Sequence, residues 1–422
     1  MDIGIHTFSK KNITVLVITV LMTLVLWGNG FWALGQPEWD GGMDRLTYIQ
    51  AVHNFFAERN LYIDIHQPLP EDLNFFNYSP LAVFTVGFVS FLPPAILFVL
   101  HFLAVTGLFL TWKAIFKRRE IDIPFWILPF WFAFSPFVYD AVTLNVNVFM
   151  ALLASLYLWF NLKDDRSAKW GAIILLFLMV TIKPQWGFFA LLPLVQRRWK
   201  DFLQMIIGVA ILFLILFGVA SLLTNLGFVF QQHILYVEHL GTFAQRFTYW
   251  NLPPGPYEYN NSIYQVVIYI LGNIKAGIAT AKLAQLGFFI ILGVIFATTI
   301  FSKKKEDEIE VQDENTLRWF FIFYCATLLY PPLNFDFSLG IPMFLFLAAQ
   351  GRLQKILVGI LLLIIAFQDI ISIIVSTLGI VSWFPFIFAD TVIALLFLLS
   401  MEPGFTGEEN RVSLEIDRNQ MR

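Results

Sequence analysis

The chain has little charge and almost no cysteine. Only 14% of its 422 residues are charged, whereas 58% are hydrophobic, and its mean hydropathy is +0.71. A chain so poor in charge is not a water-soluble globule, so we predict an all-α polytopic membrane protein. The net charge of −3 favours neither nucleic acid nor an acidic partner, which leaves lipidic partners. The single cysteine, Cys325, excludes an intrachain disulfide.

Long apolar runs dominate what is present and predict about twelve membrane crossings, several of them short. No cleavable signal is expected, because no small-residue cleavage pattern follows the first run. Residues 1–401 are expected to form one transmembrane domain, and the polar residues 402–422 a disordered cytoplasmic tail. The predicted crossings are residues 12–34, 94–115, 124–139, 147–162, 169–182, 185–196, 201–223, 282–301, 317–330, 337–350, 355–376 and 385–401.

The basic residues predict the orientation. All but six of the 27 Lys and Arg residues fall on one side of these crossings, which is then the cytoplasmic side and holds both termini. We therefore expect a multi-pass protein of the cell (plasma) membrane. Its outer face carries two long loops, residues 35–93 and 224–281, which we expect to cap an active site. Only one crossing fits between the first loop and Arg118, so residues 79–92 should be re-entrant or interfacial.

Residues 41–62 in the first outer loop predict an amphipathic helix on the outer surface, with Leu46, Ile49, Val52 and Phe56 on its apolar face. Asp44 stands at the start of this helix. An aspartate there caps the helix or, kept ionised by the helix N-terminus, serves as a base, and position alone divides these interpretations evenly. Asp40, four residues earlier, is the alternative base.

The next outer loop contains Asp140, Asn145 and Asn147. A carboxylate and short amides at a membrane mouth suit sugar hydroxyls or a metal ion. Helix capping is the favoured interpretation before other observations, above all for Asn147. Four histidines lack metal-site spacing and are interpreted as surface residues: His53, His66, His233 and His239.

Lys183 lies near the outer end of a short predicted crossing and precedes a proline. A cation there would bind a lipid-linked phosphate, although snorkelling to the interface explains it equally well. Arg246 in the second long loop is another candidate for phosphate. Aromatic rings and amides in that loop, including Trp250 and Asn261, suit a carbohydrate platform, and an interfacial aromatic belt explains them nearly as well.

The order of these features resembles the membrane glycosyltransferases of family eighty-seven, which are alpha-mannosyltransferase-like enzymes with the GT-C fold. The resemblance covers roughly residues 35–340. Two positions depart from it: Leu144-Asn145 stands where members often have Gly-Gln, and Phe337 where a His commonly follows an acidic residue. The motifs that carry the resemblance are Asp44 with Tyr48 and Ala51, Leu61-Tyr62, Asn77-Tyr78-Ser79-Pro80, Asn145-Val146-Asn147, Lys183-Pro184, Arg197-Arg198-Trp199, Asn260-Asn261-Ser262-Ile263, and Pro331-Pro332 to Asp336.

This resemblance implies an inverting transfer of a hexose, with mannose expected, from a polyprenyl-phosphate donor. The acceptor would be a hydroxyl of a lipid-linked or cell-envelope glycan on the outer face. The family's first-loop aspartate falls on Asp44, and Tyr78 belongs to a matching motif. A lipid phosphate leaves without a general acid, so one carboxylate suffices to deprotonate the acceptor. Lys183, Arg246 and Arg45 are the cations available to the phosphate.

Three alternatives stay open. A divalent metal held by Asp44 and Asp140 could stabilise the phosphate in place of the cations. A flippase or other secondary transporter of lipid-linked saccharides would have charged residues deep in its crossings, whereas the acids here gather on the outer face. A structural scaffold gives no reason for two long acidic and aromatic loops on one side.

Overall fold

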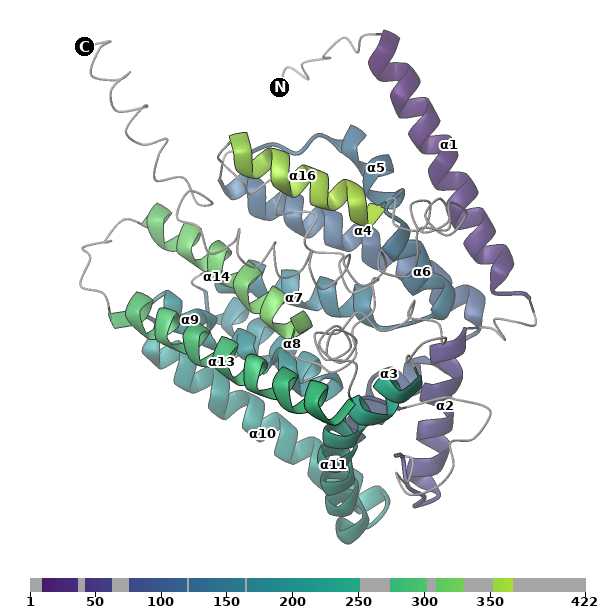
Figure 1. The fold of residues 1–422 in the computed structure, drawn as a ribbon, viewed down its shortest axis with the longest axis vertical. Coiled ribbons are helices and arrows are strands. Elements are labelled where there is room, and N and C mark those ends of the chain that lie inside the picture. The colour runs from purple at the N-terminus through teal and green to yellow at the C-terminus, as the bar shows by residue number, and fades with distance from the viewer. Residues whose placement is uncertain are drawn as a thin grey trace.

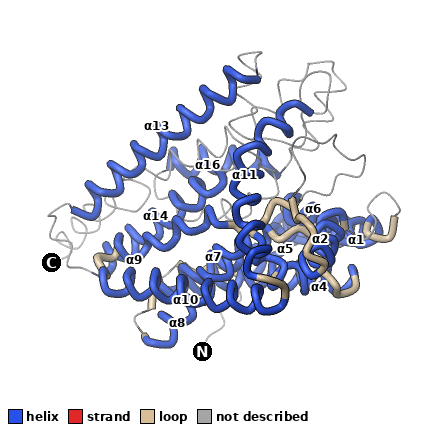
Figure 2. Tube along the Cα trace, turned by 90° about the horizontal axis from the view of Figure 1, so that it is seen from below, coloured by secondary structure: helices blue, strands red, loops and turns tan. Residues whose placement is uncertain are grey.

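Helices make up nearly all of the chain that the computed structural model describes, and no strand occurs in that part (Figures 1 and 2). This confirms the all-α prediction. The described residues are 10–36, 42–62, 76–119, 121–163, 165–250, 274–301, 309–329 and 352–366.

Three helices form the centre of the fold, and a fourth packs against the outside of α8. The central helices are α4 (Pro94–Arg118), α7 (Asn147–Asn161) and α8 (Arg166–Ile182), and the outer one is α10 (Trp199–Leu223). α4 starts on a Pro-Pro pair and ends with basic residues, both favourable at those termini. α14 (Ile309–Leu329) joins this group through a stack of Phe321 on Trp112, whose ring centroids are 5.3 Å apart. Buried aromatic rings therefore hold the core together.

The other helices surround this centre. α1 (Lys10–Ala33) lies at the edge of the molecule against α5 and α6 (Figure 1). The remaining elements are α2 (Met43–Phe56), η1 (Pro80–Phe84), α3 (Val86–Val89), η2 (Phe125–Ile127), α5 (Leu128–Phe132), α6 (Ser135–Thr143), η3 (Pro184–Leu191), α9 (Leu192–Val195), α11 (Leu226–Trp250), α13 (Ile274–Phe301) and α16 (Arg352–Ala366).

Four helices in the described part are long and apolar enough to cross a membrane, and a bent pair could add a fifth. They comprise α4, α10 and most of α1 and α13. α10 and α13 present Leu and Ile side chains outward, such as Leu222, which is 87% exposed. Apolar side chains exposed along whole helices suit contact with lipid. The protein is therefore a membrane protein, and the predicted number of twelve crossings stays a prediction.

The predicted crossing at residues 124–139 is wrong as one helix. The chain there forms η2, α5 and α6, and α6 meets α7 at 118°. Prolines at the start of α5 and of α6 account for the breaks, because proline cannot continue a preceding helix. Residues 79–92 form only η1 and α3, which together are too short to cross. The predicted crossings 337–350 and 385–401 lie outside the described residues.

The first-loop helix is present as α2, but it ends at Phe56, and its buried face only partly coincides with the predicted one. Val52 of the predicted face is buried together with Tyr48, Ala51 and Phe55, whereas Phe56 is 41% exposed. α2 packs against η1, α3 and α6. The helix is therefore held by protein on one side, and hydrophobicity alone could not distinguish this face from the neighbouring one.

Candidate active site

The corner between α6 and α7 forms the floor of the candidate site. α6 ends at Thr143 and is followed by the C-cap residue Leu144, whose φ of 54° is left-handed. The backbone N–H of Asn145 then donates to the Asp140 carbonyl at 3.0 Å. Left-handed backbone favours glycine, the residue that members of the resembled family often have here. The Leu144 side chain lies against Gly42, where an added Cβ would come within 2.6 Å of Leu144 Cδ1. Gly42 itself has a φ of 101°.

Asp140 is fully buried beneath this corner, and its Oδ2 accepts a hydrogen bond from the Val148 N–H at 2.8 Å. Val148 lies in the first turn of α7, so Asp140 serves the helix start that Asn147 was predicted to cap. That prediction was wrong: the N-cap position is Val146, and Asn147 is the first helical residue. Within the described residues, Asp140 Oδ1 makes no hydrogen bond.

Asp44 comes to this corner from α2. Its Oδ2 accepts a hydrogen bond of 2.6 Å from Asn145 Nδ2, across 101 residues of sequence. Gly42 occupies the N-cap position of α2, so Asp44 lies in the first helical turn and is not the cap. This removes the capping interpretation. Asp44 is half-buried, and its carboxylate is oriented by a side chain from the turn between α6 and α7.

Lys183 reaches the same corner from the end of α8. The helix stops at Ile182, since Lys183 precedes a proline and has extended backbone. Its Nζ donates to Asn147 Oδ1 at 2.9 Å and lies 5.3 Å from the centroid of the Tyr78 ring. The ammonium group therefore faces the corner and is held there by an amide and an aromatic face.

Two tyrosines connect Lys183 back to α2. Tyr78 Oη and Tyr48 Oη are 2.8 Å apart, and Tyr48 follows Asp44 by one helical turn. Tyr62 Oη donates to the Tyr78 carbonyl at 2.8 Å. The structure thus brings six predicted site residues into one cluster, which we name the corner site: Asp44, Tyr78, Asp140, Asn145, Asn147 and Lys183, with Asp140 beneath the other five.

The surroundings of Asp44 bring the pKa of its carboxyl group closer to 7. Burial raises the pKa of Asp44 to about 6, and the charge of Asp140 adds to this rise, whereas the Asn145 hydrogen bond and the charge of Lys183 oppose it. Burial also raises the pKa of Tyr48 and Tyr78 well above the usual value, so both remain neutral hydroxyls. A carboxylate with a pKa near 6 is ionised at pH 7 and is still basic enough to take a proton.

A divalent metal would find few ligands among these residues. No group of three or more His, Cys, Asp or Glu side chains suited to a metal occurs in the described residues. Asp44 and Asp140 would supply the carboxylates, yet Oδ2 of each already accepts a hydrogen bond. The corner also contains the ammonium group of Lys183, which would repel a divalent metal ion. This donor set does not fit a resident divalent metal, and we derive no step through one.

The remaining predicted residues do not belong to the corner site as the described residues define it. Arg45 follows Asp44 on a different face of α2 and donates from Nε to the Leu92 carbonyl at 3.4 Å. Arg246 and Trp250 belong to α11, although their side chains are outside the described set, and Asp40 and Asn261 lie outside the described residues.

Sequence reasoning missed His101, which lies in α4, is 2% exposed and contacts the corner site. The signal was available, because an ionisable residue inside an apolar crossing is a functional candidate by default. His239 was interpreted as a surface residue, and this was wrong: it is 6% exposed, and its Nε2 lies 2.9 Å from Asn77 Oδ1.

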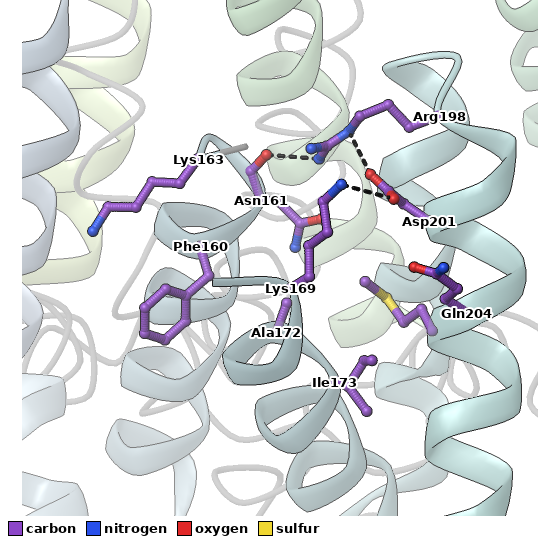
Figure 3. Close-up of a pocket in the computed structure, with 10 residues that line it drawn as sticks. Phe160, Asn161, Lys163, Lys169, Ala172, Ile173, Arg198, Asp201 and Gln204 are labelled. Atoms are coloured by element: carbon purple, nitrogen blue, oxygen red, sulfur yellow. Dashed lines mark hydrogen bonds and ion pairs between the residues drawn. The ribbon is translucent and has the colours of Figure 1, made fainter. Parts of the chain in front are cut away.

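A second polar cluster lies at the other end of α7 and α8 (Figure 3). It lines a small pocket whose walls include Lys163, Lys169, Arg198 and Asp201. Asp201 accepts from Lys169 Nζ at 3.0 Å and lies 3.5 Å from Arg198 Nε. These ion pairs tie α8 to the start of α10.

A membrane protein with a carboxylate, amides and a lysine gathered at one end of its helices suggests an enzyme at the membrane surface. Residues 75–332 match the family model of Glycosyltransferase family 87, and the chain belongs to this family. It is therefore a membrane glycosyltransferase. Comparisons with curated proteins and with solved structures found no match. The matched stretch includes Tyr78, Asp140, Asn145, Asn147 and Lys183, whereas Asp44 precedes it.

Proposed function

We propose that the protein transfers a hexose, with mannose the first candidate, from a polyprenyl-phosphate donor to a hydroxyl of a lipid-linked or cell-envelope glycan. Transfer would occur on the outer face of the membrane with inversion at the anomeric carbon. The observation that carries this proposal is the hydrogen bond from Asn145 to Asp44. It orients an acid from outside the matched stretch toward residues inside that stretch.

In this proposal Asp44 is the base. It takes the proton of the acceptor hydroxyl while that oxygen attacks the anomeric carbon from the face opposite the phosphate. The bond between the anomeric carbon and the phosphate oxygen breaks, and its electron pair leaves with the polyprenyl phosphate. A phosphate leaves as an anion, so no acid is needed on the departing side.

Lys183 is proposed to bind the departing phosphate. Its Nζ is held by the Asn147 amide oxygen and the Tyr78 ring, contacts that carry no full negative charge and leave the cation available to an anion. Tyr48 and Tyr78, as neutral hydroxyls, would hydrogen-bond substrate oxygens without competing for the acceptor proton.

Purified protein incubated with labelled polyprenyl-phosphate mannose, and separately with the glucose analogue, tests the proposal. We expect transfer to added membrane glycolipids, or slow release of free sugar to water, with a product anomer opposite to that of the donor by NMR. Transfer from nucleotide sugars alone would contradict the polyprenyl-phosphate donor, and retention of configuration would contradict a single-displacement base.

A further inference from the structure

His101 in α4 uses both nitrogens of its ring, one within its own helix and the other toward the corner site. Nδ1 lies 2.8 Å from the Leu97 carbonyl oxygen, and Nε2 lies 2.7 Å from the Asn145 carbonyl oxygen. Carbonyl oxygens only accept hydrogen bonds, so each contact needs an N–H on the ring. Only the imidazolium form has two, and a neutral ring would set one lone pair against a carbonyl oxygen.

A counter-charge for this ring is present. Asp140 Oδ2 lies 4.0 Å from His101 Nε2, and both side chains are almost wholly buried, at 0% and 2% exposure. Burial opposes a charge on the ring, and an ionised carboxylate at this distance favours it. The edge of the Phe149 ring, with centroids 4.7 Å apart, covers the imidazole on another side.

We infer that His101 is a positioning residue of this enzyme: as an imidazolium paired with Asp140, it holds the Asn145 carbonyl and so keeps the Asn145 amide on Asp44. Asn145 is the shared element, since its carbonyl meets His101 and its Nδ2 meets Asp44. The role of Asp44 as base rests on the proposed function, whereas the His101–Asn145–Asp44 connection does not.

The inference predicts the direction of a pH shift. The Asn145 hydrogen bond favours the ionised form of Asp44, so losing it raises the pKa of Asp44 further, and the acidic limb of the activity profile moves to higher pH. The other groups that act on Asp44 are Asp140, which opposes ionisation, and Lys183, which favours it. Lys183 is unaffected when His101 is changed, whereas Asp140 loses its counter-charge and then acts on Asp44 in the same upward direction.

Three His101 variants separate positioning from bulk packing. His101→Phe keeps the ring volume and removes both donors. His101→Asn carries an amide that reaches roughly the Nδ1 position, and His101→Gln one that reaches roughly Nε2, so only Gln keeps a donor for Asn145. We expect kcat to fall on the order of tenfold to a hundredfold in the Phe and Asn variants, with the KM for the donor almost unchanged. The acidic limb of the pH profile should move to higher pH in both variants. His101→Gln should recover most of this loss.

His233→Phe is the matched control, because His233 Nδ1 makes the same contact to the carbonyl four residues earlier, Val229, at 2.8 Å, within α11. It should leave the pH profile unchanged. In an Asn145→Ala background, His101→Phe should move the acidic limb less than it does in the wild-type background, because the part that runs through the Asn145 amide is already cut. An equal shift in both backgrounds, or a wild-type profile in His101→Phe, would overturn the inference.

Two spectroscopic measurements do not depend on sugar transfer. Nitrogen NMR of histidine-labelled protein, with the His101 signal assigned by its loss in His101→Gln, should show both nitrogens protonated, and a neutral signal would overturn the inference. Infrared spectra recorded across pH report the ionisation of the Asp44 carboxyl, whose signal is assigned by its loss in Asp44→Asn. The midpoint of this titration should lie at higher pH in His101→Phe than in the wild type. If wild-type protein transfers no sugar while this shift is present, the proposed function fails and the His101 inference stands.

Discussion

Charged side chains at the two ends of the α7–α8 pair have different partners. At the end shown in Figure 3, Asp201 lies between Lys169 and Arg198, and each charge meets its opposite within 3.5 Å. At the corner site, Asp44 meets an amide, Lys183 meets an amide oxygen, and Asp140 leaves one oxygen without a hydrogen bond among the described residues. The 15 residues of α7 separate the two ends by about 22 Å.

This difference separates a structural cluster from a chemical one. Charges that neutralise one another stabilise a helix junction but have little capacity left for a substrate. Charges held by neutral groups remain available to a hydroxyl proton or a phosphate, and placing them so close together costs stability. The corner site has this second character, and the family match covers most of its residues.

The largest expected contrast is between Asp44→Asn and Asp201→Asn. Loss of the base should reduce transfer on the order of 10³-fold, because proton removal from the acceptor is lost. Asp201→Asn, at the other end, should retain the wild-type rate. Initial rates of labelled sugar transfer by folded, membrane-inserted protein measure both. Near-normal turnover by Asp44→Asn would remove Asp44 from the mechanism.

Lysines at the two ends should also behave differently. Lys183→Ala should raise the KM for the donor roughly tenfold to a hundredfold, with a smaller change for the acceptor, since it removes a charge-assisted contact to the phosphate. Lys169→Ala is the control and should change neither constant. Equal effects of Lys183→Ala on both substrates would contradict a phosphate role.

Gly42→Ala should disturb the corner without touching a charge. The new Cβ would come within 2.6 Å of Leu144, and the φ of 101° at this position is one that alanine disfavours. We therefore expect the free energy of unfolding to fall by about 1–3 kcal/mol and turnover to decrease. Thermal unfolding in detergent and transfer rates measure these effects. Leu144→Gly in the same background should recover part of the turnover by removing the clashing side chain. No recovery would show that the backbone angle alone is limiting.

The pH dependence of kcat/KM should report the ionisation of Asp44. The free enzyme should lose kcat/KM as pH falls through about 6, where Asp44 takes up a proton and can no longer act as a base. Asn145→Ala should move this limb to higher pH, because the hydrogen bond it removes favours the charged form. Asp201→Asn should leave the limb in place. A limb that is unchanged in Asn145→Ala would disconnect the amide from Asp44.

The smallest effect is expected for Asp201→Asn on the stability of the protein, since Asp201 belongs to the ion pairs shown in Figure 3. Asp201→Asn breaks two ion pairs at a partly exposed junction, so we expect a loss of about 1 kcal/mol or less, seen as a modest fall in the apparent melting temperature. High salt should reduce the difference from wild type. A loss of several kcal/mol would mean that this network is as critical to the fold as the core aromatics.

Local pattern was enough for several of the long helices, although α11 lies within the predicted loop 224–281. Apolar runs predicted α1, α4, α7, α8 and α10 with ends only a few residues off, because such runs and their flanking prolines and charges act locally. The broken segment before α7 was missed. A run such as residues 124–139 looks continuous in composition, although its prolines divide it into three pieces.

By itself the sequence determined a polytopic, all-helical membrane protein with acids, amides and a lysine near helix ends, because hydrophobicity and proline act over a few residues. The tertiary structure alone decided which of those residues meet. Asp44 is oriented by Asn145 across 101 positions, and His101 reaches the same asparagine from 44 positions away. Such contacts depend on how helices pack, and on a left-handed turn at a leucine that no local rule would place there.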